Sequence, residues 1–243
     1  MPSFSVDYVT PFKDFFFPPL CFSCNARLSM GESRLCSSCW QSIRAVKRDD
    51  YTVRILSERF AAEGFIDEFY STYYFEERGV FQKLVHSLKY DGITVFGAEL
   101  GRRLGEHLRQ ETDVRSIDAI SPIPLHKLKL RERGYNQCES ICRGIALVID
   151  RPVDTTLVQR FKNTVSQTHL TADERKNNVG DAFEVGADKK ETLRGSTILV
   201  VDDVITTGST IQSVARMLKE SGAAKVIAAS AALAMLGKEE AVS

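Results

Sequence analysis

The chain has 243 residues, of which 43% are hydrophobic and 26% are charged, a balance suited to a globular protein of one or two domains. Lysine plus arginine and aspartate plus glutamate number 32 each. No overall basic charge therefore predicts nucleic-acid binding, although local patches would still permit it. The sequence shows no targeting segment and no apolar run long enough to span a bilayer. We therefore expect no membrane partner and a cytoplasmic location, where thiols are normally reduced.

The first motif along the chain is a cluster of cysteines in LCFSCNARLSMGESRLCSSCW. Two C-x2-C pairs are separated there by eleven residues, and their members are Cys21, Cys24, Cys36 and Cys39. This spacing predicts four thiolates that converge on one Zn²⁺, whereas two disulfides are disfavoured in a reducing compartment. Because four protein ligands leave no position for water, we expect a structural site whose metal helps a short module to fold.

Aromatic side chains surround these cysteines, and they are Phe12, Phe15, Phe16, Phe17, Phe22 and Trp40. If exposed, they would stack on single-stranded bases, with Arg27, Arg34 and Arg44 contacting phosphates. More often such residues cover a small ribbon or dock it on its neighbour, and we favour docking. The remaining cysteines, Cys138 and Cys142, are interpreted as small buried residues of a helix.

Composition divides the chain into a small module and a larger domain. Residues 1–50 are dense in Pro, Cys and Phe and are predicted to form a zinc-ribbon module with an N-terminal extension. A charged helical pattern covers about 41–64, and we assign 51–64 as a helical linker. The larger domain is predicted over 65–235, followed by a tail over 236–243.

Strand and helix patterns alternate along the larger domain. Strands are expected at 65–75, 116–124, 197–201 and 225–234. Helices are expected at about 80–90, 96–110, 135–149 and 209–221, where apolar residues recur at helical spacing. A basic loop precedes the third helix, and the polar segment 157–184 is interpreted as an excursion. The order predicts an α/β fold with an open, mostly parallel sheet and flanking helices.

The stretch ILVVDDVITTGST, residues 198–210, joins an apolar strand to a helix. Asp202 and Asp203 follow the apolar run directly, at the strand end where ligands bind in an open parallel sheet. Adjacent carboxylates repel each other, and a strand end does not need them for folding. The pair therefore predicts a bound ligand.

The turn after the acids, Thr206 to Thr210, suits an anion. Backbone N–H groups at a helix start carry a partial positive charge. Gly208 permits close approach, and the Thr and Ser hydroxyls add donors. Because carboxylates accept hydrogen bonds and vicinal ribose hydroxyls donate them, a ribose 5-phosphate would satisfy the acids and the turn together.

A nucleotide-binding loop, a receiver domain and an ordinary strand end fit this stretch less well. A Walker A loop would need G-x-x-x-x-G-K-[ST], which the stretch lacks. A two-component receiver domain has its acids near its start, and only 40 residues follow Asp203. The interpretation without a ligand, an acidic strand end followed by an ordinary helix N-cap, does not explain why the acids and the hydroxyl-rich glycine turn occur together.

The same stretch resembles the thirteen-residue PRPP-binding motif of type I phosphoribosyltransferases. The resemblance implies that Asp202 and Asp203 are the catalytic acids and hold the 2- and 3-hydroxyls of the ribose. It also implies a 5-phosphate site made of Thr206, Thr207, Gly208, Ser209 and Thr210. Ser209 stands where many such motifs have a second glycine, and a small residue is expected to fit there.

A second loop, PIPLHKLKLRERGYNQ at 122–137, lies upstream of the acids and carries Lys127, Lys129, Arg131 and Arg133. These cations suit a diphosphate and its Mg²⁺, and a solvated basic turn is the alternative. RERGYNQ resembles the R-x-R-G-[FY]-N-Q signature of the ComF family, which are competence-associated phosphoribosyltransferase-like proteins. The resemblance implies a pyrophosphate loop made of Arg131, Arg133, Gly134, Tyr135, Asn136 and Gln137.

The excursion 157–184 is similar to the mobile hood of the same family, and part of it to the equivalent loop of amidophosphoribosyltransferases. The matching positions are Arg160, Thr164, Gln167, Leu170, Arg175 and Asn178. Closure of such a hood would exclude water from a reactive sugar centre. As the alternative, the segment is a polar surface loop.

The resemblance covers nearly the whole chain, from about residue 17 to 235, because four-cysteine ribbons precede the phosphoribosyltransferase domain in many ComF-type chains. It implies a PRPP-binding protein that transfers a phosphoribosyl group to an unidentified base or amine, with Mg²⁺ and release of pyrophosphate. It also implies a link to natural competence and DNA uptake. As the alternative, the pocket serves a non-catalytic PRPP sensor that binds single-stranded DNA or a helicase or recombination partner.

Overall fold

The computed structural model describes residues 18–90, 92–160 and 183–235. Its centre is a four-stranded sheet with the order β1-β6-β5-β2. The strands are β1 (Glu68–Phe75), β2 (Ala119–Pro122), β5 (Thr197–Ile205) and β6 (Lys225–Ala234). All three neighbouring pairs are parallel, so the carboxyl ends of the strands meet at one edge of the sheet. Each expected strand is present, and β5 continues past the predicted 197–201 to include both acids.

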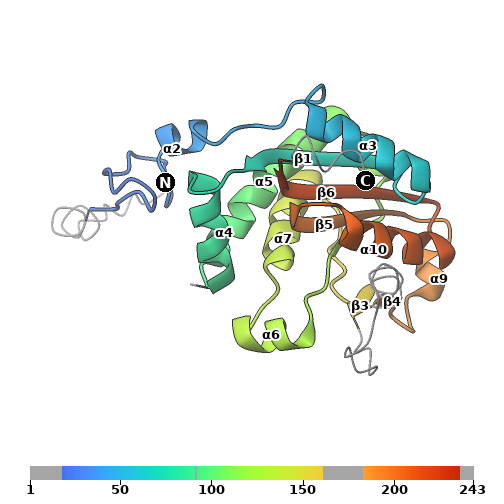
Figure 1. Cartoon of the computed structure of the whole chain (residues 1–243). Coiled ribbons are helices and arrows are strands. Elements are labelled where there is room, and N and C mark those ends of the chain that lie inside the picture. The colour runs from blue at the N-terminus through green and yellow to red at the C-terminus, as the bar shows by residue number, and fades with distance from the viewer. Residues whose placement is uncertain (1–17, 91, 161–182, 236–243) are drawn as a thin grey trace, which may run out of the picture.

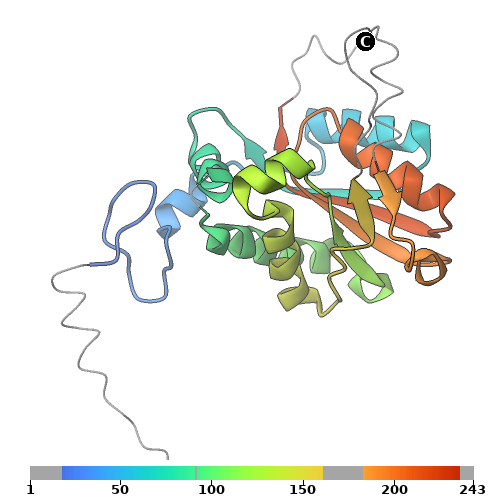
Figure 2. The same cartoon turned by 90° about the horizontal axis from the view of Figure 1, so that it is seen from below.

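Two helical layers cover the sheet, because its central strands are apolar on both faces. On one face lie α4 (Val80–Tyr90), α5 (Thr94–Glu111) and α7 (Gln137–Ile149). On the other face lie α3 (Tyr51–Glu63) and α10 (Ser209–Glu220). Figure 2 shows the sheet running between these two layers. The fold is the α/β arrangement that the alternating patterns predict.

The remaining elements are short and lie around this core (Figure 1). They are α2 (Ser37–Gln41), η1 (Val114–Ser116), α6 (Lys127–Arg133), β3 (Val158–Arg160), β4 (Phe183–Val185) and α9 (Lys190–Leu193). Strands β3 and β4 form an antiparallel pair at the two ends of the expected excursion. Among the described residues, no helix has both the length and the apolar character needed to cross a membrane.

Two local expectations differ from the structure. The charged pattern over about 41–64 is not one helix, because α2 ends at Gln41 and α3 begins at Tyr51. Between them the chain runs along β1, where Val46 N donates to Thr72 O at 3.0 Å and Ala45 bridges Tyr73. The basic loop before α7 contains a helix, α6, which Gly134 ends with a φ of 77°.

Helix α3 occupies the segment that we expected to act as a linker. Its Leu56 and Phe60 are buried against Tyr74 and Ile205 of the sheet. Asp50 precedes the helix and accepts a hydrogen bond from the Tyr74 hydroxyl at 2.9 Å. The segment is therefore one of the layers that cover the sheet.

The cysteine module packs directly on the larger domain. Cys21, Leu35 and Cys39 belong to the same buried cluster as Tyr73 and Phe81. The Phe22 ring lies 5.0 Å from that of Phe96, and Trp40 lies 6.3 Å from Tyr73 and 4.0 Å from the Arg103 guanidinium. Both described aromatics of the module thus contact the neighbouring domain, as the docking interpretation expects. Phe12, Phe15, Phe16 and Phe17 lie outside the described residues.

Helices α5 and α7 approach each other unusually closely because glycines line their contact. A Cβ at Gly101 would lie 2.0 Å from the backbone oxygen of Ile141, and one at Gly144 would lie 2.1 Å from that of Ala98. Gly97 and Gly105 continue the same face of α5. The contact fixes α7, whose first turn reaches the acids described below.

We predict that Gly101→Ala destabilises the protein by about 2 kcal/mol, because overpacking against backbone outweighs the gain in helix propensity. Urea unfolding measures the change. Leu147→Ala, at a position on α7 that is 82% exposed, serves as the control and should change stability by less than about 0.5 kcal/mol. A Gly101→Ala variant as stable as this control would contradict the close helix contact.

Candidate functional site

The two acids lie on the part of β5 that extends beyond the end of its neighbour β2. Strand β2 pairs with β5 only as far as Pro122 opposite Val201. On the other side, β5 stays paired with β6 until Ile205. Asp202 and Asp203 therefore follow the last residue paired to β2, and the edge beside them is open for a ligand.

The turn after β5 is shaped by its contact with α3. Gly208 has a φ of 82°, and a Cβ there would lie 2.6 Å from the Phe60 ring. Arg59, also on α3, donates a hydrogen bond to Thr207 O at 3.1 Å. Position 208 requires glycine for two reasons, its left-handed φ and the Phe60 ring that fills the space beside it.

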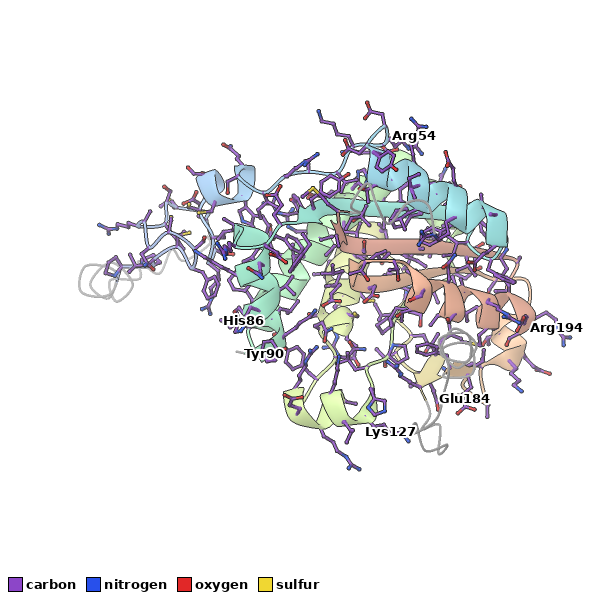
Figure 3. The ribbon with its side chains drawn as sticks, in the orientation of Figure 1. Arg54, His86, Tyr90, Lys127, Glu184 and Arg194 are labelled. Carbon is purple, nitrogen blue, oxygen red and sulfur yellow. The ribbon has the colours of Figure 1, made fainter. Side chains whose placement is uncertain are left out.

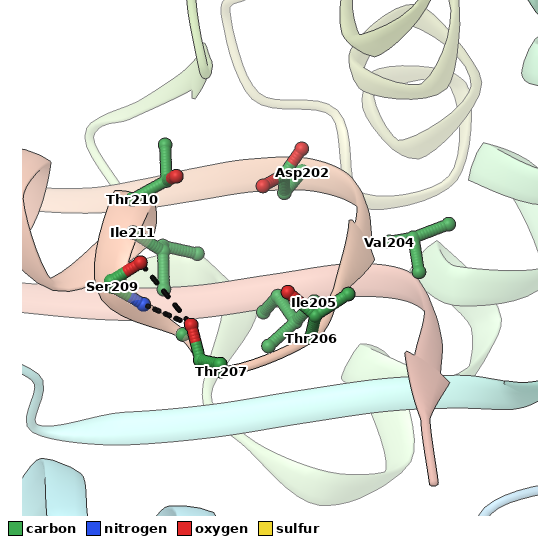
Figure 4. A pocket seen from close by; sticks show the side chains of 9 residues that line it. Asp202, Val204, Ile205, Thr206, Thr207, Ser209, Thr210 and Ile211 are labelled. Atoms are coloured by element: carbon green, nitrogen blue, oxygen red, sulfur yellow. Dashed lines mark hydrogen bonds between the residues drawn. The ribbon is translucent and has the colours of Figure 1, made fainter.

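The turn and the start of α10 form a small pocket (Figure 4). It is lined by Asp202, Val204, Ile205, Thr206, Thr207, Gly208, Ser209, Thr210 and Ile211. Thr207 Oγ1 lies 3.2 Å from Ser209 Oγ and 3.5 Å from Ser209 N. The first N–H groups of α10 have no acceptor within the helix, so hydroxyls and backbone donors converge here. All five residues predicted to hold the 5-phosphate line this pocket.

The two acids face different surroundings. Asp202 lines the pocket together with the turn. Asp203 is 6% exposed and turns toward the opposite helical layer, where its Oδ2 atom lies 2.7 Å from Lys89 Nζ and accepts a hydrogen bond from Gln137 Nε2 at 3.2 Å. Backbone groups hold both carboxylates, because Asp203 N donates to Asp202 Oδ1 and Val204 N to Asp203 Oδ1.

The electrostatics of the pair are unfavourable for two negative charges. Burial and the neighbouring Asp203 carboxylate raise the pKa of Asp202 to about 8, against the opposing effect of Lys89. Near neutral pH, the unliganded pair therefore holds a proton on Asp202. Asp202 can then donate a hydrogen bond as well as accept one.

The Cys138 thiol lies beside the same acid, with its sulfur 3.7 Å from Asp202 Oδ1. The sulfur and one oxygen of each acid lie within 4.8 Å of one another. Burial raises the pKa of Cys138 well above its ordinary value, so the thiol stays protonated and acts as a weak donor. Cys138 and Cys142 are both buried, as the sequence predicts.

The predicted pyrophosphate loop reaches the acids only through its second half. Asn136 caps α7 by accepting from Cys138 N and also donates to Ile123 O at 2.9 Å. Gln137 contacts Asp203 and accepts a hydrogen bond from Arg133 Nη1 at 3.0 Å. Tyr135 is partly buried against the core.

The first half of the loop extends outward on α6. No residue of this helix is buried, and Lys127, Lys129 and Arg131 are exposed. Figure 3 shows Lys127 on α6, with Tyr90 and His86 at the facing end of α4. Arg131 is thus exposed on this helix, whereas Arg133, its last residue, is linked to Asp203 through Gln137.

Of the predicted hood, the structure describes only its two ends, 157–160 and 183–184. Arg160 ends β3, and its guanidinium lies over the Phe183 ring at 5.2 Å from the centroid. Thr164, Gln167, Leu170, Arg175 and Asn178 lie outside the described residues.

The four predicted metal ligands come together at the other end of the molecule. Cys21, Cys24, Cys36 and Cys39 each offer a sulfur atom, and the four sulfurs lie within 4.8 Å of one another. The Cys21–Cys39 and Cys24–Cys36 sulfur distances are 3.8 and 3.7 Å, which fits the edges of a tetrahedron around one metal with Zn–S bonds of about 2.3 Å. The cluster is therefore compatible with a structural zinc site.

Two site residues were not predicted from the sequence. Lys89 in the last turn of α4 contacts Asp203, and Arg59 on α3 contacts the carbonyl of Thr207 in the turn after β5. Both lie on helices that are more than 100 residues before the acids in the sequence. The only local signal is the placement of Lys89 in the last turn of an amphipathic helix, which also suits a helix dipole.

Comparison with known proteins matches one family model and several relatives. Residues 136–241 match the family model described as a phosphoribosyl transferase domain. DNA utilization protein YhgH of Salmonella typhimurium is 34% identical over 146 residues, which cover 59% of this chain and 63% of that protein. Competence protein F of Haemophilus influenzae is 26% identical over 222 residues, which cover 87% of this chain and 95% of that protein. Competence protein ComFC of Bacillus subtilis is 25% identical and covers 84% of this chain and 80% of its own length.

Among solved structures, a glutamine PRPP amidotransferase from B. subtilis, complexed with ADP and GMP, matches with a TM-score of 0.41 and 19% identity. The match covers 60% of this chain and 30% of the amidotransferase. The parallel sheet, the family model and the acidic pair with its turn define a domain of the type I phosphoribosyltransferase fold, preceded by a four-cysteine cluster. The chain is thus similar to Competence protein F and Competence protein ComFC, and it contains a match to the phosphoribosyl transferase domain.

The raised pKa of Asp202 predicts how stability depends on pH. Between about pH 4 and pH 8 the folded protein binds more protons than the unfolded chain, so the free energy of unfolding falls as the pH rises. Asp202→Asn removes this titration, and at pH 8 we expect the variant to be about 2 kcal/mol more stable than the wild type. Urea unfolding at several pH values measures the slope.

Glu132→Gln, at an exposed position on α6, is the control and should keep the wild-type slope. An Asp202→Asn protein with an unchanged dependence on pH would contradict a raised pKa at this position.

Proposed function

We propose that this chain binds PRPP at the carboxyl edge of the sheet and transfers its phosphoribosyl group to an acceptor, with Mg²⁺ and release of pyrophosphate. The observation that carries the proposal is the meeting of Asp202 with the turn Thr206–Thr210 in one pocket. An acceptor for sugar hydroxyls and a set of donors for a phosphate lie side by side there, as a ribose 5-phosphate requires.

The three parts of PRPP have separate places in this proposal. The 5-phosphate binds the hydroxyls of the turn and the first N–H groups of α10, where the helix dipole adds positive potential. The ribose hydroxyls donate to Asp202 and Asp203. The pyrophosphate and its Mg²⁺ lie toward Arg133 and the start of α7, since Gln137 of α7 contacts Asp203 and accepts a hydrogen bond from Arg133. Mg²⁺ prefers phosphate and carboxylate oxygens, so the neighbouring Cys138 thiol is not proposed as a ligand.

Transfer requires orientation and charge neutralisation from the protein. The bond between C1 of the ribose and the pyrophosphate oxygen breaks, and its electron pair leaves with the pyrophosphate. A nitrogen of the acceptor base or amine forms the new bond to C1 and loses a proton. Because the transition state resembles an oxocarbenium ion, cations near the leaving group and the exclusion of water favour the reaction.

Calorimetric titration of PRPP with Mg²⁺ tests the proposal. We expect wild-type protein to bind PRPP, and Asp202→Ala/Asp203→Ala to lose at least about 2 kcal/mol of binding free energy because the ribose hydroxyls lose their acceptors. Glu191→Gln, at an exposed position on α9 outside the pocket lining, should bind as the wild type does. Equal binding by the double variant would contradict the assigned pocket.

Pyrophosphate release, measured in parallel with a panel of bases and amines, distinguishes the two functions left open by the sequence. Release that depends on an acceptor supports a transferase. PRPP binding without release supports a PRPP-sensing adaptor, for which the names of the relatives, competence and DNA utilization, suggest a role in DNA handling. Phe22 and Trp40 already contact the neighbouring domain, so they do not favour the ribbon as a platform for single-stranded bases.

We further propose that the four-cysteine cluster holds one Zn²⁺ that stabilises the ribbon and its packing on the domain. Protein purified under reducing conditions should contain one zinc per chain, and Cys24→Ser should lose the metal and unfold at a lower temperature. Elemental analysis and thermal unfolding measure both effects. Ser38→Ala, an exposed change in the same module, should leave both unaltered. Metal-free protein with two disulfides would refute the zinc site.

A further inference from the structure

Lys89 is a cation at the acid pair that the predicted site did not include. It lies in the last turn of α4, a helix anchored by the burial of Phe81, Leu84 and Leu88. Its ammonium lies 2.7 Å from Asp203 Oδ2, and its side chain is 23% exposed. The helix is therefore fixed, whereas the Lys89 side chain is partly exposed to solvent.

Both oxygens of Asp203 are already engaged without a ligand. Oδ1 accepts from Val204 N at 2.9 Å, and Oδ2 contacts both Lys89 and Gln137. A ribose hydroxyl that donates to Asp203 must therefore share with or replace one of these partners. Gln137 is 3% exposed and is held by Arg133, so Lys89 is the partner with freedom to leave.

A second cation, Arg133, lies near Lys89. The next residue, Tyr90, has its ring 5.4 Å from the Arg133 guanidinium carbon and 4.8 Å from the His86 ring. Arg133 in turn donates to Gln137, which donates to Asp203. Two cations are thus linked to Asp203, Lys89 of α4 directly and Arg133 at the end of α6 through Gln137. A diphosphate entering between them would be contacted from two elements.

We propose that Lys89 binds the pyrophosphate of PRPP, and that without a ligand it forms an ion pair with Asp203 instead. In the unliganded protein it neutralises Asp203. When PRPP enters, a ribose hydroxyl takes its place on Asp203, and the ammonium moves to a pyrophosphate oxygen. The inference rests on the proposed function, since it assigns a residue to the same site.

The test compares PRPP with ribose 5-phosphate, which lacks the pyrophosphate, in calorimetric titrations with Mg²⁺. Weak ribose 5-phosphate binding is measured by competition against PRPP. Lys89→Met should weaken PRPP binding about tenfold or more, because a charge-assisted contact is lost. Ribose 5-phosphate should bind it as well as the wild type or more tightly, because Asp203 has lost a competing partner. Lys89→Arg should restore most of the PRPP affinity.

The matched control is Lys83→Met on the same helix, where Lys83 is exposed and contacts the carbonyl of Ser23. It should bind both ligands as the wild type does. If Lys89→Met proves unfolded by thermal melting, Lys89→Gln is measured in its place.

Two results would overturn the inference alone: unchanged PRPP affinity in Lys89→Met, or an equal loss for both ligands, which a role limited to holding Asp203 would produce. Failure of the wild-type protein to bind PRPP would overturn the proposed function and this inference with it. Binding by the wild type is therefore measured first.

Discussion

Two adjacent carboxylates on one buried strand are costly to hold, and much of the structure around them serves to hold them. Asp203 is buried between α4 and α7, where Lys89 and Gln137 contact it. Asp202 faces the pocket with a raised pKa. A ligand that supplies hydrogen-bond donors to both acids would relieve this unfavourable charge, since each carboxylate would then have the donors it requires. This charge is the physical basis of the proposal that sugar hydroxyls bind there.

The helices that precede the sheet also shape the site. Phe60 on α3 fills the space beside Gly208, and Arg59 holds the carbonyl of Thr207. On the opposite face, α4 contacts the cysteine module at one end, where Lys83 donates to Ser23 O, and the acid pair at the other, through Lys89. The ribbon and the pocket are therefore joined through one helix, and the loss of metal would act on the element that carries Lys89.

Local patterns predicted most of the fold, because apolar spacing and turn residues within a short segment are enough to indicate each strand or helix. The apolar run before Asp202 predicted the strand, and the glycine turn after it predicted the position of the pocket. Such patterns did not reveal α6, because its side chains remain exposed and give no amphipathic signal. Lys89, Arg59 and the glycine contact of α5 with α7 were missed for a different reason. These features depend on which distant segments pack together, and a single sequence does not show this.

The most direct test of PRPP binding at the acid pair is a crystal structure of the protein with PRPP and Mg²⁺. We expect the 5-phosphate in the turn Thr206–Thr210 and the ribose hydroxyls within hydrogen-bond distance of Asp202 and Asp203. The pyrophosphate should lie on the side of Arg133. A sugar bound in the opposite direction, with its pyrophosphate in the turn, would contradict the assigned site. So would a pocket that stays empty at saturating PRPP.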